Sequence, residues 1–389
     1  MTVLKSNLLF ENALSALKYH TEHRPETTAF KLIDSFGNTT EQATYQQIWQ
    51  RTLTLAQHVS LQCKAGDRVL LLYQNGIEVV CALLACMASQ TIAVPCATLK
   101  KQPNTETISA LRLTSIVKNT EPELILCSSQ QWYELVKPNK IGRPAWQGTT
   151  ILDTESIESC PSLCELRLHD IAYLQYTSGT TGQAKGVIIT HKNLSNNINQ
   201  MMTAANAGEH PRFHTAVNWL PYHHDMGLIN SILMPLYAGN PSIILSPFSF
   251  LKNPLVWLDT ISQYPAVTSG GPGFCYDHCC RRLSSQQIAQ LDLSTWTLAY
   301  VGSESIRPQQ IQRFCEQFAC TGFKPTAFHP CYGLAETVVH ACGDWRFEGI
   351  RSLTHRLKSR NQQTANEIQL TNLGKPFNDH CIHIVDPRT

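Results

Sequence analysis

Apolar residues follow two different spacings in the first third of the chain, and the two spacings alternate. Residues 10–20 and 44–63 carry apolar side chains three or four positions apart, as on the buried face of a helix, and residues 76–89 form a mostly apolar helix. Short apolar runs predict buried strands at 69–73, 91–95 and 124–127. This order of strand, helix and strand favours a parallel α/β sheet.

The alternation continues toward the C-terminus. Further strands are predicted at 171–176, 187–190, 216–220, 242–245 and 299–301, and helices at 191–205, 254–263 and 308–318. The chain has 389 residues, which is enough for two or more subdomains. A boundary near residues 160–170 fits the pattern.

The composition excludes several classes of protein. Hydrophobic residues make up 43% of the chain and charged residues 15%, and the net charge of +2 includes no long run of one sign. We therefore expect no nucleic-acid partner and no polybasic membrane patch. The longest apolar run, Ile77–Met87, contains Glu78 and is too short to cross a bilayer, so no transmembrane segment is expected.

The 15 cysteines are scattered and include no Cys-x-x-Cys pair. Several lie in apolar runs, such as Cys81 and Cys86, and a chain of this length does not need disulfides for stability. We interpret them as reduced, mostly buried residues. Because the N-terminus also lacks the apolar block of a signal peptide, we expect a cytoplasmic protein.

A glycine-rich run, Tyr176–Gly186, lies between two predicted strands and reads Tyr-Thr-Ser-Gly-Thr-Thr-Gly-Gln-Ala-Lys-Gly. Its glycines allow backbone conformations that bring several N–H groups toward one anion, and the Thr and Ser hydroxyls and Lys185 add donors. This chemistry suits a polyphosphate. It is not a Walker A loop, because it lacks the Gly-Lys-Ser/Thr ending and a strand follows it. The alternative is a polar hairpin turn without a ligand.

This run resembles the phosphate-binding signature of the adenylate-forming superfamily, which includes acyl-CoA synthetases, peptide-synthetase adenylation domains, luciferases and fatty acyl-AMP ligases. These enzymes join a carboxylate to AMP and release pyrophosphate. The resemblance implies that ATP phosphates are held by Thr177, Ser178, Gly179, Thr180, Thr181, Gly182 and Lys185, with Thr181 also near the metal.

The resemblance also implies a fold. We expect two flavodoxin-like α/β subdomains with parallel-rich sheets packed together, plus part of a small β-barrel-like subdomain. The first subdomain would span 1–170, with elements shared with the second, which would span 171–345 and carry the ATP and acyl sites. Residues 346–389 would be an insertion-like segment and the start of the β subdomain.

A second segment, Trp219–Leu228, contains His223, His224 and Asp225 in succession. Adjacent residues on an extended chain point to opposite faces, so they form a poor metal-ligand set. By resemblance, this segment shapes the acyl pocket, and His224 contacts the carboxylate or the α-phosphate. The fatty acyl-AMP ligase pattern has Tyr where His223 stands. A structural histidine is the alternative role for His224. Acyl-site residues implied here are His224, Asp225, Met226 and Gly227.

Two glycine turns follow. Ser269–Tyr276 resembles a run that lies beside the acyl chain and nucleotide in fatty acyl-AMP ligases, although Gly273 replaces an Asn; it would contribute Gly271 and Phe274. Other candidates for an apolar tunnel are Ile232, Leu233 and Met234, each of which could equally belong to the core. Cys275, His278, Cys279 and Cys280 mimic a metal site, but a buried helical face is the favoured interpretation. Tyr300–Ile306 would place Gly302, Ser303 and Glu304 under the adenine and ribose.

The run Pro330–Thr337 matches the family pattern Tyr-Gly-x-x-Glu. The resemblance implies that Tyr332, with Gly333, Leu334 and Ala335, packs on adenine, and that Glu336 binds the Mg²⁺ that bridges the ATP phosphates. Mg²⁺ indeed prefers one or two carboxylates together with phosphate oxygens. Lys185, His224 and Glu336 are thus the candidate catalytic residues, with ATP and Mg²⁺ as cofactors.

Several segments, among them Trp219–Gly227 and Ser246–Leu258, resemble fatty acyl-AMP ligases more than the CoA-dependent branch. The implied activity is activation of a fatty acid for an acyl carrier protein of a lipid, polyketide or peptide pathway. Arg346–Leu370 is a candidate for the insertion of that branch, or a solvated loop. Family members continue past Thr389 into a mobile catalytic domain, so slow turnover is expected. The alternatives are an acyl-CoA synthetase or amino-acid adenylation domain, and a non-catalytic nucleotide-binding remnant.

Overall fold

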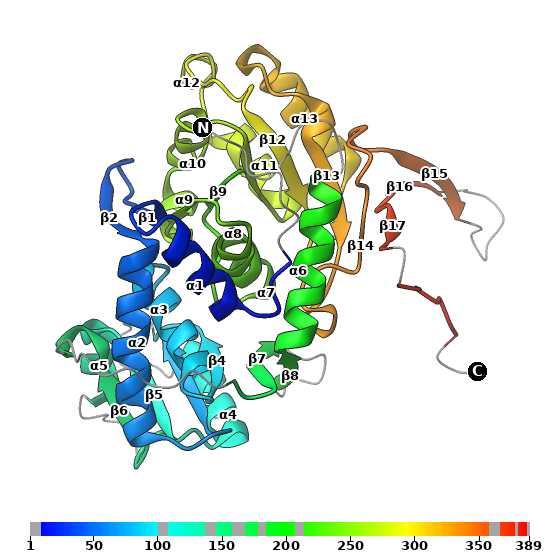
Figure 1. Cartoon of the computed structure of the whole chain (residues 1–389). Coiled ribbons are helices and arrows are strands. Elements are labelled where there is room, and N and C mark those ends of the chain that lie inside the picture. The colour runs from blue at the N-terminus through cyan, green and yellow to red at the C-terminus, as the bar shows by residue number, and fades with distance from the viewer. Residues whose placement is uncertain are drawn as a thin grey trace.

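A computed structural model describes residues 9–99, 108–136, 145–157, 168–177, 184–206, 214–357, 366–377 and 380–386. The described chain forms an α/β fold with two large, mostly parallel sheets and one two-stranded sheet (Figure 1). The predicted fold class is confirmed. No helix in these ranges is long and apolar enough to cross a membrane.

The six-stranded sheet has the order β6-β5-β3-β4-β7-β8. Its strands pair in parallel, except that β7 and β8 form an antiparallel hairpin. The strands β4 and β5 are apolar and buried along their whole length, and β3 is so after its first residue, as expected where both faces of a parallel sheet are covered. The bounds are β3 Arg68–Leu72, β4 Ile92–Cys96, β5 Leu124–Cys127, β6 Thr150–Asp153, β7 Ile171–Thr177 and β8 Lys185–Thr190.

The nine-stranded sheet has the order β17-β14-β13-β12-β11-β9-β10-β1-β2. Six neighbouring strands, β13 to β1, run parallel, and antiparallel pairings close both edges, with β2 at one and β14 and β17 at the other. The bounds are β1 Thr28–Ile33, β2 Thr39–Thr44, β9 Thr215–Asn218, β10 Ser242–Leu245, β11 Val267–Gly271, β12 Trp296–Val301, β13 Phe328–Tyr332, β14 Cys342–Gly343 and β17 Lys375–Pro376.

The two sheets are interleaved along the sequence. The hairpin β7–β8 belongs to the six-stranded sheet, together with strands from before residue 170, whereas the hairpin β1–β2 belongs to the nine-stranded sheet. The helix α3 lies between them, and eleven of its twelve residues are buried, which explains why its sequence is apolar except for the partly exposed Glu78. One continuous core joins both sheets, and a smaller cluster covers the other face of the six-stranded sheet.

Helices begin where side chains can cap them. Thr44 and Thr190 each accept a hydrogen bond from a backbone N–H of the first helical turn, of α2 and α6, which satisfies a donor with no partner inside the helix. The helices are α1 Ala13–His23, α2 Tyr45–Gln62, α3 Ile77–Ala88, α4 Ile108–Thr120, α5 Ser129–Val136, α6 His191–Ala205, α7 Asp225–Leu228, α8 Met234–Ala238, α9 Pro247–Lys252, α10 Leu255–Ser262, α11 Gly273–Arg282, α12 Ser285–Ile288 and α13 Pro308–Gln317. Short helical turns occur at Thr154–Ser156, Ile229–Leu233, Ala319–Thr321, Pro325–Ala327 and Ala335–Thr337.

The segment predicted as an insertion or a solvated loop contains a β-hairpin. β15 (Ser352–Leu357) and β16 (Asn366–Thr371) pair beyond the edge of the nine-stranded sheet (Figure 1). The hairpin is tied to the body of the protein by two hydrogen bonds, Gln309 Nε2 to Gln369 Oε1 at 2.8 Å and Thr371 Oγ1 to the Ile306 carbonyl at 2.8 Å. Two basic residues of this segment, Lys358 and Arg360, lie outside the described residues.

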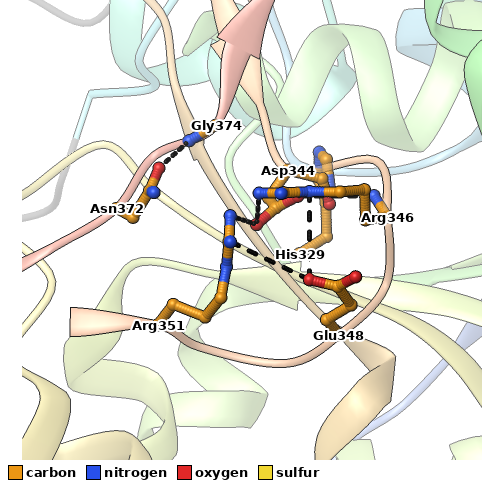
Figure 2. A network of polar contacts seen from close by, with 7 residues as sticks. All are labelled: His329, Asp344, Arg346, Glu348, Arg351, Asn372 and Gly374. Carbon is orange, nitrogen blue, oxygen red and sulfur yellow. Dashed lines mark hydrogen bonds and ion pairs between the residues drawn. The ribbon is translucent and has the colours of Figure 1, made fainter.

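An ionic cluster, Asp344–Arg346–Glu348–Arg351, holds the chain between β14 and the hairpin. Arg346 and Arg351 converge on the Asp344 carboxylate (Figure 2), with Nε–Oδ1 and Nη2–Oδ2 distances of 2.9 and 3.1 Å from Arg346 and an Nη2–Oδ2 distance of 2.8 Å from Arg351. Asp344 itself is buried. Beyond the hairpin, the Asn372 side chain accepts the Gly374 N–H at 2.8 Å, and the Asn372 N–H donates to the Arg351 carbonyl at 2.8 Å, which joins the two ends of the hairpin.

Candidate active site

The carboxyl ends of β7, β9, β11, β12 and β13 are followed by the segments that the sequence marks as functional. In open α/β sheets this edge is where ligands bind, because the loops after parallel strands gather there. The two sheets are joined at this point by a hydrogen bond from Gln175 Nε2 in β7 to the His223 carbonyl after β9, at 2.8 Å. The predicted phosphate, acyl and adenine segments therefore border one region.

The glycine-rich run connects the hairpin β7–β8. Thr177 pairs with Lys185 across the hairpin, and the Lys185 side chain is exposed. Gly186 allows a close approach to Tyr176, whose ring lies 3.0 Å from the position that a Cβ would occupy. Ser178, Gly179, Thr180, Thr181 and Gly182 lie outside the described residues. Their contact with phosphate stays a prediction.

Tyr222 anchors the segment between β9 and α7. Its hydroxyl accepts the Tyr73 N–H at 3.0 Å and lies 2.7 Å from the Cys96 carbonyl and 2.9 Å from the Leu71 carbonyl, all in the interior. Gly227 also fixes this segment, because a Cβ there would lie 2.0 Å from the Pro221 carbonyl oxygen. The family pattern has Tyr where His223 stands in this chain. In the structure, the buried phenol that holds this segment comes from the preceding residue, Tyr222.

His224 lies at the start of α7 with an exposed side chain. Partial removal from water and, second, the positive charge of Arg112 lower the pKa of His224. The imidazole is therefore neutral at pH 7. Arg112 comes from α4, where its Nη2 donates to the Tyr176 carbonyl at 3.3 Å. Sequence reasoning missed Arg112, since it belongs to no motif and only the fold brings it to this edge.

Two carboxylates, Asp225 and Glu336, influence each other at the same edge. Burial, and second the charge of Glu336, raise the pKa of Asp225, while the Met226 N–H at 2.7 Å opposes the shift. Glu336 lies in the helical turn after β13, and its side chain is exposed. Like charges placed together are relieved by a bound cation.

The loop after β12 is held in an unusual conformation. Ser303 has a positive φ of 64°, and a Cβ on Gly302 would lie 2.9 Å from the Cys331 carbonyl oxygen, so the loop lies flat against β13. Glu304 accepts the Phe274 N–H at the start of α11 at 2.8 Å. This bond joins the loop after β12 to the helix after β11. The role of Glu304 as a partner for α11 was not visible in the sequence.

The loop after β13 turns sharply at Gly333, where a Cβ would lie 1.6 Å from the Val339 carbonyl oxygen. No residue other than glycine fits at this turn. Tyr332 has 48% of its surface exposed, so its ring face is available to a ligand, whereas Ala335 is buried and Leu334 half-buried. The placement of Tyr332 beside Gly302 and Ser303 suits the predicted adenine site, which no ligand tests here.

A narrow cavity of about 50 Å³ opens beneath this edge and extends down between β12, β13 and the helices on that face. Asp225, Ser303 and Gly333 lie at its mouth. Its walls include three methionines, whose unbranched side chains adapt to an inserted ligand. The lining residues are Met201, Asp225, Met226, Asn230, Met234, Thr268, Leu298, Tyr300, Ser303, His329, Cys331, Gly333, Val339, His340 and Trp345.

Of the predicted acyl-site residues, Asp225, Met226 and Met234 line the cavity. Ile232 and Leu233 are buried in the core, and Gly271 packs against the Trp219 ring. Phe274 is 40% exposed and contacts Trp219 edge to face, with ring centroids 6.0 Å apart. These residues do not line the cavity.

The far end of the cavity is formed by residues that sequence reasoning missed, namely His329, His340 and Trp345. His329 stacks on Trp345 with ring centroids 4.1 Å apart, and the His340 ring lies 5.2 Å from that of Trp345. Burial lowers the pKa of His329 to about 4 and that of His340 to about 3. Both imidazoles are therefore neutral at pH 7.

The cysteines and histidine of α11 pack as the sequence suggested. Cys275 and Cys279 are buried, and burial raises the pKa of the Cys280 thiol to about 12. Within the described ranges, no group of three or more His, Cys, Asp and Glu side chains has the arrangement of a metal site.

Comparison with known proteins identifies relatives. The family model described as "AMP-binding enzyme" matches residues 17–389. The medium-chain-fatty-acid acyl-carrier-protein ligase JamA of Moorena producens is 30% identical over 350 residues, covering 89% of this chain and 58% of the relative. The 4-hydroxyphenylalkanoate adenylyltransferase of Mycobacterium marinum is 32% identical over 379 residues, covering 93% and 60%. The chain thus spans less than two thirds of these curated relatives.

A solved structure also matches. The fatty acyl-adenylate ligase from L. pneumophila, in complex with acyl adenylate and pyrophosphate, superposes with a TM-score of 0.84 at 32% identity. The match covers 100% of this chain and 67% of that chain.

Proposed function

The chain belongs to the AMP-binding enzyme family of the adenylate-forming superfamily, and we propose that it serves to activate a fatty acid with ATP, giving acyl-AMP and pyrophosphate. The observation that carries this proposal is the cavity whose mouth is shared with the predicted nucleotide loops: Asp225, Ser303 and Gly333 border both. A carboxylic acid whose chain fills the cavity presents its carboxylate at that mouth. The proposal applies to the protein with the full length of its relatives.

Binding of the nucleotide is proposed for the loops around the mouth. Lys185 and the glycine-rich run would hold the phosphates, and Tyr332 would pack on the adenine above Gly302. Reaction requires that the carboxylate oxygen attack the α-phosphorus in line with the leaving pyrophosphate, so positioning and charge neutralisation are the main contributions of the protein.

Mg²⁺ fits the residues present. Glu336 is exposed in the turn after β13, and its charge raises the pKa of Asp225, which marks a place where a cation would be favourable. When bound to Glu336 and the phosphates, with Thr181 also predicted nearby, the ion would neutralise charge on the phosphate oxygens. The neutral His224 would donate a hydrogen bond from a ring N–H to the carboxylate or the α-phosphate. Because the ring carries no second proton, no proton has to leave it afterwards.

The acyl acceptor is proposed to be the thiol of an acyl carrier protein. JamA is named for such a transfer, and the β15–β16 hairpin occupies the place of the insertion expected in the fatty acyl-AMP ligase branch. An acyl-CoA synthetase is the competing function. Parallel assays with CoA and with an acyl carrier protein would distinguish the two functions by the thioester that forms. These assays need the protein extended to the length of its relatives.

The nucleotide proposal can be tested on this chain by calorimetry with ATP and MgCl₂ and with a non-hydrolysable acyl-adenylate analogue. We expect both to bind, and Lys185→Met to weaken ATP binding about tenfold, which corresponds to ~1.4 kcal/mol. Lys192→Met is the matched control, because Lys192 is an equally exposed lysine on the neighbouring α6. Absence of binding by either ligand would favour a remnant without nucleotide-binding function.

A further inference from the structure

Resting on the proposed function, we propose that the acid activated by this protein carries a hydroxyl group near the far end of its chain, and that His329, His340 and Trp345 select it. The relatives differ in the acids for which they are named, so kinship does not decide this point. The residues at the far end of the cavity indicate the substrate instead, because they are polar and four of their nitrogen atoms have no hydrogen-bond partner among the described residues.

Four nitrogen atoms at the far end have no hydrogen-bond partner among the described residues: His329 Nε2, His340 Nδ1 and Nε2, and Trp345 Nε1. His329 and His340 are 2% and 5% exposed. A buried polar group without a partner is unfavourable, and nearly all buried polar groups in proteins are paired. Four such atoms around one cavity indicate that its occupant supplies the partners.

The two imidazoles converge on one point. His329 Nε2 and His340 Nε2 each lie 2.6 Å from the position that a Cβ would take on Gly343. Any side chain at Gly343 would meet both of these nitrogens, and both rings belong to residues that line the cavity.

The tautomer of His329 determines which group can bind. Its Nδ1 lies 3.1 Å from the Asp344 carbonyl oxygen, which can only accept, so Nδ1 carries the proton. The ring is neutral, and Nε2 is therefore an acceptor. Trp345 Nε1 is a donor. The neutral His340 ring adds one further N–H donor. A hydroxyl group can donate to His329 Nε2 and accept from Trp345 Nε1 and from the N–H of His340, and so supplies partners to all three residues. A carbonyl or ether oxygen would leave His329 Nε2 unpaired.

A second carboxylate is excluded by charge. The two histidines are neutral, and no arginine or lysine of the described part of the chain lines the cavity, so a buried carboxylate would find no counter-ion there. The depth sets the chain length. His329 lies four residues before Gly333 along an extended segment, which is roughly 13 Å. A zigzag chain with bonds of about 1.5 Å advances roughly 1.3 Å per bond, so the hydroxyl is expected near the tenth carbon.

The test measures the affinity of this chain for non-hydrolysable acyl-adenylate analogues of C8 to C12 acids, each with a terminal methyl, hydroxyl or methoxy group. We expect the hydroxyl form to bind about tenfold more tightly than the methyl form at the best length, and the methoxy form to gain nothing. His340→Phe keeps the ring stacking and breaks no described side-chain hydrogen bond, and it should reduce the preference at least threefold. His191→Phe is the matched control: His191 is also buried with two unpaired nitrogens but lies outside the cavity.

The outcomes separate the two proposals. If the methyl analogues bind as tightly as the hydroxyl analogues, or if His340→Phe leaves a preference unchanged, the polar-end inference is wrong while the proposed adenylation stands. If no analogue binds and ATP also fails to bind, the proposed function itself is wrong. Thermal midpoints of all variants, measured without ligand, would show that each is folded.

Discussion

The ionic cluster around Asp344 should stabilise the junction between the nine-stranded sheet and the β15–β16 hairpin. The perturbation is Asp344→Asn, which keeps the shape of the side chain but removes its charge. The amide then presents an N–H₂ group toward one guanidinium, at a place where Arg346 and Arg351 now donate three hydrogen bonds of 2.8 to 3.1 Å.

The expected magnitude follows from burial. Asp344 is 3% exposed, and breaking a fully buried ion pair costs about 3–5 kcal/mol. The arginine side chains, however, are 51% and 37% exposed, so water screens them and replaces part of the interaction. We therefore expect Asp344→Asn to destabilise the protein by about 2 kcal/mol. In a chain of 389 residues that corresponds to a fall in Tm of about 2–3 °C.

The assay is thermal unfolding at a fixed scan rate, combined with limited proteolysis of residues 346–357. Glu348→Gln is the control within the same cluster: its carboxylate lies 4.0 and 3.9 Å from the two arginines and is 54% exposed, so its Tm should stay within about 1 °C of wild type. A double variant with Arg351→Met should lose less than the sum of the single changes. An unchanged Tm and cleavage rate for Asp344→Asn would refute the reasoning.

Three further predictions concern the site. Tyr222→Phe should cost about 1–3 kcal/mol, because it leaves the Tyr73 N–H and the Leu71 and Cys96 carbonyls unpaired in the interior; the loss is measured as a lower Tm with unchanged circular dichroism. Gly227→Ala should weaken acyl-adenylate-analogue binding at least tenfold, since its Cβ would lie 2.0 Å from the Pro221 oxygen, whereas Gly37→Asn, in an open turn, should bind normally. The free energy of unfolding should have its full value above pH 6.5 and should fall as the pH is lowered toward 4. Burial lowers the pKa of His20, His191 and His329 to about 4, so between these pH values the three histidines gain protons in the unfolded chain but not in the folded one. His340, with a pKa of about 3, adds to this slope, so His340→Phe should flatten it by up to about 1.4 kcal/mol per pH unit.

The strands predicted from apolar runs are those buried on both faces, such as β3, where four successive residues are buried. The strands missed lack that signal. β2 is an edge strand with mostly exposed, polar side chains, so no alternation marks it. β13 contains His329 and Pro330, and proline argues against a central strand. Pro330 nevertheless takes part in the sheet through its carbonyl, which accepts the Asp344 N–H at 3.2 Å.

The residues of the candidate site also fall into two groups, those that the sequence marks and those that it does not. The loops at the mouth are short motifs with dense glycine, and sequence alone marked them because local backbone requirements leave a local signature. The far end of the cavity has no such signature. His340 and Trp345 meet His329 only because β14 returns antiparallel to β13, pairing Cys331 with Gly343. Such a contact depends on topology rather than spacing.

Asp344 connects the two parts of the structure that sequence reasoning could not describe. Its carboxylate binds the arginines that lead into the hairpin, while its carbonyl accepts the His329 Nδ1–H and so sets the tautomer at the cavity end. A hairpin that moved away would pull on β14 at Asp344 and weaken that hydrogen bond. Asp344→Asn should therefore reduce the preference for hydroxylated analogues as well as the Tm, whereas Glu348→Gln should change neither. Loss of Tm without any loss of preference would show that the backbone of β14 holds His329 independently of the ionic cluster.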